Sequence, residues 1–183
     1  MTEFPDVEYI DTLPEFGDAR LRTLFDYWKG LCVGGQPPVR PQIDPSHLVR
    51  LLSIVWIFER ETDGRYLCRL VGEDLRRVVG RKAIGEYLDE MAAEPGNSIL
   101  KYQYDLVLDG PSVVYSNGHI YRKGLDRIGT GERLVLPLRD KDGNLTMLLG
   151  ATTYETTGTR MKDAYPAGGD PVRRYVAPLS ALI

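Results

Sequence analysis

An amphipathic stripe near the N-terminus is the clearest pattern in the chain. After Asp18, six apolar residues recur at the spacing of one helix face, about 100° per residue. These residues are Leu21, Leu24, Phe25, Trp28, Leu31 and Cys32. Asp18 is a favourable N-cap, and Gly34 and Gly35 favour an end to the helix. The pattern predicts an amphipathic helix within residues 16–35, whose apolar face needs a cover.

Two predicted strands follow a stiff, proline-rich connector. Residues 51–60 are rich in Ile, Val, Trp and Phe, and both alternating sets of positions are largely apolar. This pattern is typical of a strand that is covered on both faces. Asp63 and Gly64 favour a hairpin turn, and residues 65–71 form the second strand, which ends at Gly72.

The next segment is predicted to be helical. Short apolar pieces in residues 73–93 are interrupted by Gly80 and Gly85, which favours several short helices. A longer helix is expected from the capping residues at 97–98 to about Leu108. Its narrow polar side holds Lys101, Asp105 and Asp109, and apolar residues occupy most of the rest. We therefore expect this helix to be mostly buried.

Three more strands are predicted after this helix. They cover residues 112–122, 133–139 and 145–154, and the last two are joined by a turn at residues 140–144. The strand at 145–154 again lacks a charged face, so it too is expected to be covered on both sides. Residues 129–131, Gly-Thr-Gly, are interpreted as a flexible connector.

The order of these elements predicts an α+β fold. Five strands joined in this way form an antiparallel sheet with the later helices packed on one face. The opposite face is also apolar, and the N-terminal helix is the available cover. We expect one domain over residues 36–155, with residues 1–15 as a flexible leader and residues 156–183 as a tail.

Composition and charge narrow the class of protein. With 183 residues, of which 43% are hydrophobic, the chain can bury one domain core. Its 26 acidic and 23 basic residues are interspersed and give a net charge of -3. Charges distributed in this way produce no long-range positive field that would attract a phosphate backbone, so we expect no nucleic-acid partner. No apolar run approaches the roughly 20 residues of a membrane helix, so we expect no membrane partner.

The N-terminal residues and the two cysteines indicate the compartment. Glu3, Pro5 and Asp6 stand where a secretory signal would carry basic and then apolar residues, so a cytoplasmic location is expected. Cys32 and Cys68 lie in a helix end and a strand, which suits reduced thiols better than a disulfide.

Several short segments occur in a characteristic order and spacing. They are Tyr27-Trp28, Pro37–Arg40, Ile43–Pro45, Arg69–Gly72, Gly80, Gly85, Leu136–Leu138 and Leu148–Gly150. Together they resemble the stand-alone bacterial branch of the PAS sensor superfamily, over roughly residues 20–154. The resemblance implies a PAS fold, a pocket between the sheet and the longer helix, and a sensory or regulatory role. It names no ligand, because members bind haem, flavin, organic acids or nothing.

Candidate ligand-binding residues lie on the longer helix. Gln103 falls inside the apolar arc, between Ile99 and Val107. A buried amide left unpaired costs about 1–3 kcal/mol. Gln103 therefore either anchors a ligand or bonds to neighbouring protein groups, unless the helix turns it toward solvent. Tyr102 and Tyr104 either line the same cavity or fill the core.

Two strands carry further candidates. One face of the strand at 112–122 is bulky and polar, with Tyr115, Asn117 and His119. If this face points inward, it forms a hydrogen-bonding wall opposite Gln103 for a small polar metabolite; otherwise it meets water or the N-terminal helix. Arg69 is either a carboxylate-binding fork or an exposed arginine that pairs across the sheet.

Signals for cofactors, metals and catalysis are negative. The only histidines are His47 and His119, and neither lies on the longer helix, where haem-binding PAS proteins carry their axial ligand. Cys68 lacks the surrounding motif of flavin photosensors. No cluster has metal-ligand spacing, and no nucleophile has an obvious catalytic partner. We expect no cofactor, no metal site and no enzymatic activity.

The predicted function is that of a PAS-type sensor that binds a small molecule and signals through protein–protein contact. A homodimer is expected, with Leu21, Leu24, Phe25, Trp28 and Leu31 at its interface, and a protein partner receives the signal. One alternative is a ligand-free scaffold whose cavity is filled by its own side chains. Another is a small enzyme on an α+β sheet.

Overall fold

The computed structural model describes residues 7–79, 82–91, 96–121, 127–160 and 172–183. Within these residues, seven strands form one sheet in the order β1-β7-β4-β5-β6-β2-β3. The strands are β1 (Glu8–Tyr9), β2 (Val55–Arg60), β3 (Tyr66–Val71), β4 (Ser112–Tyr121), β5 (Arg127–Leu138), β6 (Met147–Arg160) and β7 (Arg173–Pro178). Neighbouring strands are antiparallel, except that β1 runs parallel to β7.

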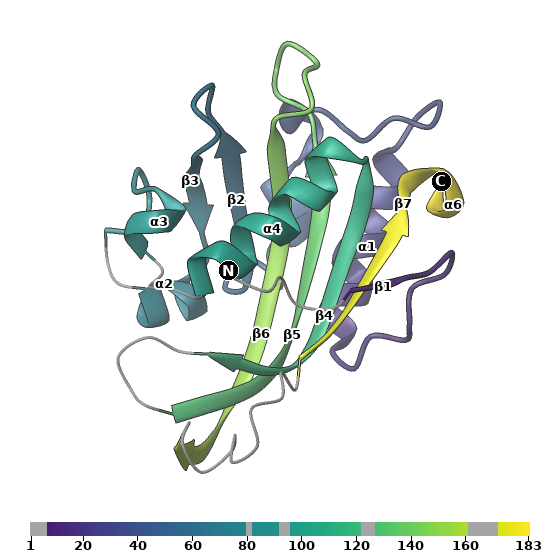
Figure 1. Cartoon of the computed structure of the whole chain (residues 1–183). Helices are drawn as coiled ribbons and strands as arrows, with labels where there is room; N and C mark the ends of the chain where they lie inside the picture. The colour runs from purple at the N-terminus through teal and green to yellow at the C-terminus, as the bar shows by residue number, and fades with distance from the viewer. Residues whose placement is uncertain (1–6, 80–81, 92–95, 122–126, 161–171) are drawn as a thin grey trace.

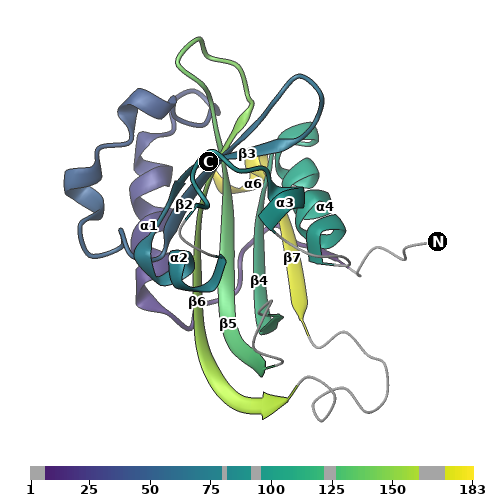
Figure 2. The same ribbon diagram turned by 90° about the vertical axis from the view of Figure 1, so that its left-hand side faces the viewer.

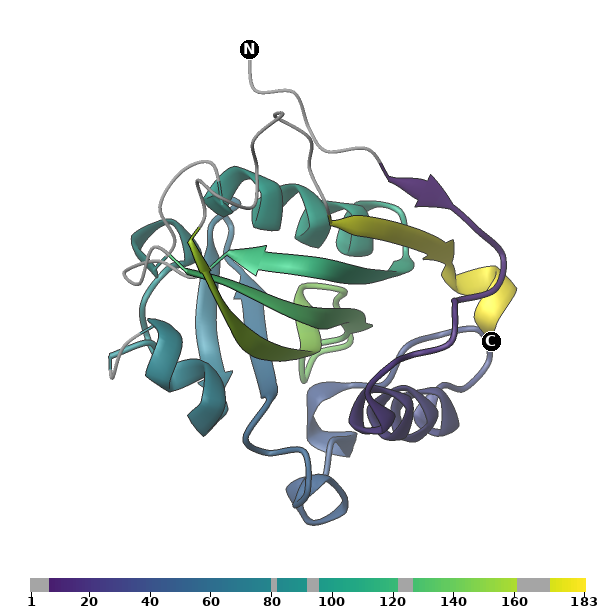
Figure 3. The ribbon, with the colours of Figure 1, turned by 90° about the horizontal axis from the view of Figure 1, so that it is seen from below.

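Helices cover both faces of this sheet. They are α1 (Ala19–Leu31), α2 (Glu73–Val79), α3 (Leu88–Met91), α4 (Gly96–Asp109) and α6 (Leu179–Leu182), with short 3-10 turns η1 (Arg40–Gln42) and η2 (Pro45–Leu48). In Figure 1, α4 crosses in front of the sheet and α1 lies behind it. Figures 2 and 3 show the same two helices on opposite sides of the strands. The predicted α+β fold with a doubly covered sheet is confirmed.

The α1 face of the sheet is closed by the predicted amphipathic stripe. Asp18 caps α1, since its side chain accepts a hydrogen bond from the Arg20 backbone N–H at 2.8 Å. Leu21, Leu24 and Trp28 have no exposed surface. The Trp28 indole N–H donates to the Pro137 carbonyl on β5 at 2.8 Å, which satisfies the one polar group that the helix buries here.

A carboxylate from the sheet fixes the entry to α1. Glu132 on β5 accepts hydrogen bonds from the backbone N–H groups of Gly17 and Asp18, both at 2.7 Å. It also accepts from the Tyr115 hydroxyl on β4 at 2.6 Å. Burial, followed by this hydrogen bond, raises the pKa of Tyr115 above its usual range. Glu132 therefore links the helix start to the two central strands.

The α4 face is aromatic where α4 crosses β2 and β3. The ring centroids of Trp56, Phe58 and Tyr66 lie 5.4, 5.5 and 5.1 Å from that of Tyr104 on α4. Gly150 on β6 makes room for this cluster, because a Cβ atom at that position would collide with the Trp56 ring. The rings fill the space between α4 and this end of the sheet.

The predicted count of five strands was wrong. The five expected strands are present as β2 to β6, but residues 8–9 and 173–178 add β1 and β7. β1 has only two residues, too few to show alternation. β7 follows a Gly- and Pro-rich stretch and buries Arg174, so its inner face does not look apolar. The predicted leader and tail thus contribute to the sheet; their residues 1–6 and 161–171 lie outside the described part.

Several boundaries also differ from prediction. β6 continues to Arg160 instead of ending at residue 154. β2 begins at Val55, because residues 51–54 form turns in which Ile54 N–H donates to the Leu51 carbonyl. Residues 129–131 are part of β5 rather than a connector. Position 131 requires glycine because β5 and β6 approach closely there, and a Cβ atom would collide with the Thr153 carbonyl. The predicted helix break at Gly80 lies outside the described residues.

The two cysteines are free thiols, as predicted. Cys32 belongs to the α1 side and Cys68 to the α4 side of the sheet. Burial raises the pKa of each to about 11, so both are protonated at neutral pH. Among the described helices, none has the length and apolar character needed to cross a bilayer.

Candidate functional site

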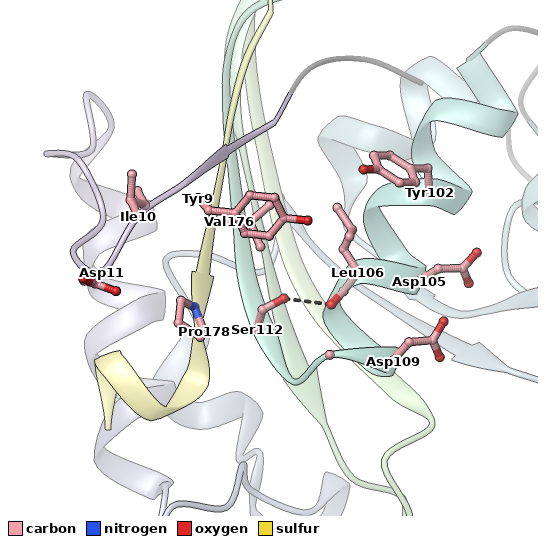
Figure 4. A pocket seen from close by; sticks show the side chains of 11 residues that line it. Tyr9, Ile10, Asp11, Tyr102, Asp105, Leu106, Asp109, Ser112, Val176 and Pro178 are labelled. Atoms are coloured by element: carbon pink, nitrogen blue, oxygen red, sulfur yellow. Dashed lines mark hydrogen bonds between the residues drawn. The ribbon is translucent and has the colours of Figure 1, made fainter. Parts of the chain in front are cut away.

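A groove opens between α4 and the edge of the sheet formed by β7 and β1 (Figure 4). Its volume is about 520 Å³, within the range of small-molecule sites. It is lined by Tyr9, Ile10, Asp11, Tyr102, Asp105, Leu106, Asp109, Gly110, Ser112, Val176 and Pro178. We call this the α4–β7 groove. Three separate parts of the chain build it: the N-terminal segment, α4 with the start of β4, and the C-terminal strand.

The floor of the α4–β7 groove is apolar and its rim is acidic. Leu106 and Val176 lie across from each other, and the Ser112 hydroxyl donates to the Leu106 carbonyl at 2.8 Å (Figure 4). Tyr9 and Tyr102 stand at the same end of the groove. Burial, and then the neighbouring Tyr9, raise the pKa of Tyr102.

Two of the rim carboxylates are already engaged. Asp105 accepts hydrogen bonds from the Tyr66 hydroxyl and the Lys101 ammonium, both at 2.7 Å. Asp109 pairs with the Arg60 guanidinium at 2.6 Å. Lysine and arginine are absent from the described lining. The groove therefore suits a largely apolar molecule that is neutral or carries a positive charge.

A row of polar side chains lies on the same face of the sheet, closer to the middle of α4. Ser116 on β4 is directly opposite Arg133 on β5 and Arg174 on β7, and Arg133 is directly opposite Thr152 on β6. We call these four residues the polar row. Directly opposite residues share a face of the sheet, and this face is the one that packs on α4.

The polar row contacts Gln103 of α4. Gln103 is 2% exposed, and its amide oxygen accepts a hydrogen bond from the Ser116 hydroxyl at 3.3 Å. Arg133 Nε donates to the Thr152 hydroxyl at 3.2 Å, and the same hydroxyl accepts from the Trp56 indole at 3.0 Å. Burial lowers the pKa of the Arg133 guanidinium, and Arg174 nearby lowers it further.

A second, smaller cavity lies beside β6, next to α1 and α2. It measures about 190 Å³ and is lined by Arg20, Ile54, Asp74, Arg77, Thr152, Thr153 and Tyr154. α2 closes it, because the Tyr154 hydroxyl donates to the Asp74 carbonyl at 3.0 Å. Its volume leaves little room for an organic ligand.

The structure divides the predicted site residues between the two faces. Gln103 lies on the buried side of α4 that faces the sheet, and Tyr102 on the same helix lines the α4–β7 groove. Tyr115 and Asn117 instead lie on the α1 face, where the Asn117 amide donates to the Tyr115 hydroxyl at 3.4 Å. Strand alternation therefore points Val114 and Ser116, not the bulky polar set, toward Gln103. The side chain of His119 lies outside the described residues.

Arg69 is far from both the groove and the polar row. It is exposed on β3 and pairs with Glu59 at 2.5 Å and Glu61 at 3.1 Å. Glu59 lies on the neighbouring strand β2 and Glu61 comes directly after its end, so these ion pairs join the two adjacent strands. Of the two interpretations of Arg69, the placement favours an exposed arginine that pairs across the sheet.

The stripe assigned to a dimer interface is enclosed within the chain. Leu21, Leu24 and Trp28 are fully buried, and Phe25 is 6% exposed, against the sheet of the same molecule. Leu31 is half-buried and packs against the same core. Leu21, Leu24 and Trp28 therefore have no surface for contact with a second copy, because they already cover the sheet of their own molecule.

Sequence reasoning missed Arg133, Arg174 and Thr152. Each lies in a segment where apolar residues occupy every second position. A polar residue in such a set indicates a buried polar side chain, and this was the signal that could have identified it. For Arg133 that alternation continues through Val135, which packs on α4. Arg174 was not considered as a site residue because residues 156–183 were assigned to a tail.

A protein-family model described as PAS domain matches residues 18–153. The chain belongs to the PAS domain family. The matched range excludes β1 and β7, so two of the three walls of the α4–β7 groove lie outside it. A search of curated proteins found no match.

Solved PAS-fold structures resemble the chain at low identity. VqmA of Vibrio cholerae bound to DPO is 14% identical with a TM-score of 0.47, covering 61% of this chain and 56% of VqmA. A sensory box sensor histidine kinase from Vibrio cholerae is 21% identical with a TM-score of 0.44, covering 61% of this chain and 89% of the other. An RNA-binding light-oxygen-voltage receptor is 16% identical with a TM-score of 0.42, covering 68% of this chain and 37% of the receptor. At these identities the likeness concerns the fold alone.

The prediction that the protein has no nucleic-acid partner was wrong, because it excluded nucleic acid on the net charge of the chain alone. A VqmA complex with ligand and DNA, and the RNA-binding receptor, are among the structures that resemble this chain. A net charge of -3 describes the whole chain and says nothing about where basic side chains gather locally. Net charge was therefore insufficient evidence for that prediction.

Proposed function

We propose that the protein is a PAS-type sensory module that binds a small, largely apolar molecule in the α4–β7 groove and passes its occupancy to a protein partner. The single observation that supports the proposal is the cavity of about 520 Å³. It has an apolar floor, two tyrosines and a few polar groups, the composition expected of a small-molecule site.

The position of the groove suggests how occupancy is transmitted. β1 is held to β7 by a two-residue parallel ladder and by the Ile10 N–H, which donates to the Val176 carbonyl at 3.0 Å. So short a ladder is weak by itself. A molecule that touches Tyr9, Val176 and Tyr102 together stabilises the pairing of β1 with the domain. Occupancy then changes the order of the N-terminal segment, which a partner can detect.

A binding experiment tests this proposal. Small neutral and cationic aromatic compounds are screened by thermal shift with the full chain, and hits are measured by isothermal titration calorimetry. We expect Tyr102→Ala to raise the Kd of groove ligands about tenfold, which corresponds to about 1.4 kcal/mol for one lost aromatic wall. Tyr9→Ala is expected to act in the same direction with little effect on stability, because Tyr9 is 68% exposed.

Tyr27→Ala is the matched control. Tyr27 lies on α1, on the opposite face of the sheet, where its hydroxyl accepts from the Asp44 N–H at 2.8 Å. Ligand affinity should survive this change. Absence of any hit, or a hit whose affinity survives both Tyr102→Ala and Tyr9→Ala, contradicts the proposal.

A ligand-free scaffold is the second candidate, and a specific observation favours it. The Trp56, Phe58, Tyr66 and Tyr104 rings fill the space between α4 and strands β2 and β3, and Gln103 is bonded to Ser116. In that case the protein acts through its surface alone, and the screen returns no groove ligand. The predicted homodimer and the predicted lack of enzymatic activity stay predictions.

A further inference from the structure

The outer edge of β7 is only partly covered. Among the described strands, only β1 lies beyond β7, and it pairs with Tyr175 and Val176 alone. β7 itself runs from Arg173 to Pro178, so most of its edge has no strand partner within the described part of the chain. In Figure 4, β1 crosses this edge beside the groove. An exposed strand edge is a template for pairing with another chain.

β1 is held to this edge by few contacts. Both of its residues, Glu8 and Tyr9, are exposed, so their side chains bury little surface. The ladder continues only through the Ile10 N–H, which donates to the Val176 carbonyl at 3.0 Å. The firmer anchor of the N-terminal segment is the set of hydrogen bonds to Glu132, which holds the start of α1. Release of β1 therefore breaks few contacts and leaves α1 in place.

The backbone groups of Arg174 and Val176 point outward from β7. The Val176 carbonyl accepts from Ile10 outside the strand, and backbone polar groups alternate between the two sides of a strand. Arg174, two residues earlier, therefore presents its N–H and C=O to the same edge. In an antiparallel pair of two β7 strands, Arg174 of one copy exchanges two hydrogen bonds with Val176 of the other, and two-fold symmetry repeats the exchange.

Of the three registers centred on residues 174 to 176, one fits. With Val176 opposite itself, Arg174 faces Pro178, which has no N–H to donate. With Arg174 opposite itself, two like charges stand directly opposite, which is destabilising. The register between them places Tyr175 opposite Tyr175, a favourable aromatic pair. The β7 edge is therefore self-complementary in this register.

The charges at the two ends of β7 favour the same arrangement. The strand begins at Arg173, which is exposed, and ends at Pro178, which lines the α4–β7 groove together with Asp109. The Asp109 side chain is 64% exposed. Antiparallel pairing brings Arg173 of each copy toward the Asp109 end of the other. Opposite charges are thus matched twice across the two-fold axis.

We propose that the outer edge of β7 is an interface with a second copy of this chain, and that β1 covers it in the monomer. Once β1 is released, two β7 strands pair antiparallel about Tyr175 and join the two sheets into one. Two short edges bury less surface than a standard interface, so the expected Kd of the released form is about 10–100 µM. In the intact chain β1 competes as a tethered strand, so the dimer forms only at higher concentration. The interface needs no ligand in the groove, and its tests use none.

Sedimentation equilibrium of the full chain tests the competition between β1 and a second copy. Ile10→Pro removes the N–H that donates to Val176 and so weakens β1. At about 100 µM, we expect at least nine tenths of the wild type to be monomer and at least half of Ile10→Pro to be dimer. Ile10→Ala is the matched control, because it shortens the side chain but keeps the N–H, and it should stay monomeric.

A disulfide across the two-fold axis tests the register. In the Ile10→Pro background, Tyr175→Cys places two thiols at directly opposite positions, with Cα atoms about 4.5 Å apart, which is within the range of a disulfide. We expect a covalent dimer in oxidised glutathione. Arg173→Cys is more exposed but lies opposite Ala177, so it should cross-link at less than about a tenth of that rate. The Ile10→Pro parent has only the native thiols, which are protonated, and should form no covalent dimer.

Three results would overturn the proposal. Ile10→Pro stays monomeric at about 200 µM, its dimer survives Tyr175→Lys, which sets two positive charges opposite each other, or Arg173→Cys cross-links as fast as Tyr175→Cys. If Ile10→Pro does not fold, the two cysteine variants are compared in the otherwise unchanged chain, where transient release of β1 exposes the edge. The proposal then requires slow cross-linking of Tyr175→Cys alone, and its absence rejects the interface.

Discussion

The two faces of the sheet are built from alternating residues of the same strands, yet they differ in chemistry. On the α1 face, Tyr115, Leu134 and Leu136 pack in one core with the apolar side of α1, and Glu132 bonds the start of the helix to the strands. On the α4 face, Ser116 and Arg133 take the alternate positions, and a groove opens beside them. The first face is sealed by the chain itself. The second face has buried polar groups, and beside them is a groove that the side chains of the chain do not fill.

The largest effect is expected on the sealed face. Trp28→Ala removes a fully buried indole and its hydrogen bond to Pro137. It should lower the free energy of unfolding by about 3–5 kcal/mol in urea denaturation. Affinity for groove ligands should be unchanged under conditions where the variant is folded. A loss of that affinity would show that the two faces are coupled.

A smaller effect is expected where the α4 face is aromatic. Gly150→Ala pushes a methyl group into the Trp56 ring and should cost about 1–3 kcal/mol. Because the two positions touch, Gly150→Ala combined with Trp56→Phe should be less destabilised than the sum of the two single changes. Additive free energies in chemical denaturation would contradict this packing.

Glu132→Gln tests the carboxylate that fixes α1. The change keeps the shape but replaces one accepting oxygen with a donor, and three donors at 2.6–2.7 Å lose a charged partner. We expect a loss of about 2 kcal/mol in the free energy of unfolding. Glu155→Gln, at an exposed position on β6, is the control and should change stability by less than about 0.5 kcal/mol. Equal effects would argue against the link.

The smallest effect is expected at the helix cap and depends on pH. Hydrogen bonding to the Arg20 side chain holds the pKa of Asp18 below its ordinary value of 3.8. The charged form thus favours the folded state, and its contribution is complete above pH 3.8 and lost as pH falls through the lower folded pKa. Asp18→Asn should therefore be less stable by about 0.5–1 kcal/mol at pH 7 and equal to the wild type near pH 2. A constant difference across this range would refute the charge effect.

Much of the architecture could be predicted because its signals are periodic. The α1 stripe, the two apolar faces of β2 and β6 and the buried side of α4 each follow from alternation or from helical spacing. The α1 face was located correctly for the same reason, since Leu21, Leu24 and Trp28 needed a cover. β1 and β7 escaped notice because one is too short and the other buries an arginine.

The candidate site was harder to predict because alternation gives two faces without saying which is inner. Tyr115 and Asn117 seemed the polar wall, but the register of β4 turns Ser116 to Gln103. The α4–β7 groove is lined by residues that lie as far apart in the sequence as Tyr9 and Pro178. Contacts between such distant segments produce no periodic pattern that sequence analysis could detect. Arg133 could be identified only once its strand was known to face α4.

Hydrogen–deuterium exchange in the presence of a groove ligand tests the difference between the two faces most directly. The account predicts that a compound identified in the screen slows exchange at the Ile10 amide, which bonds to Val176 across β1 and β7. Exchange should stay unchanged at the backbone amides of Leu134 and Leu136 on β5, whose side chains face α1. Protection that appears only on the α1 side, or no change at Ile10 under saturating ligand, would contradict it.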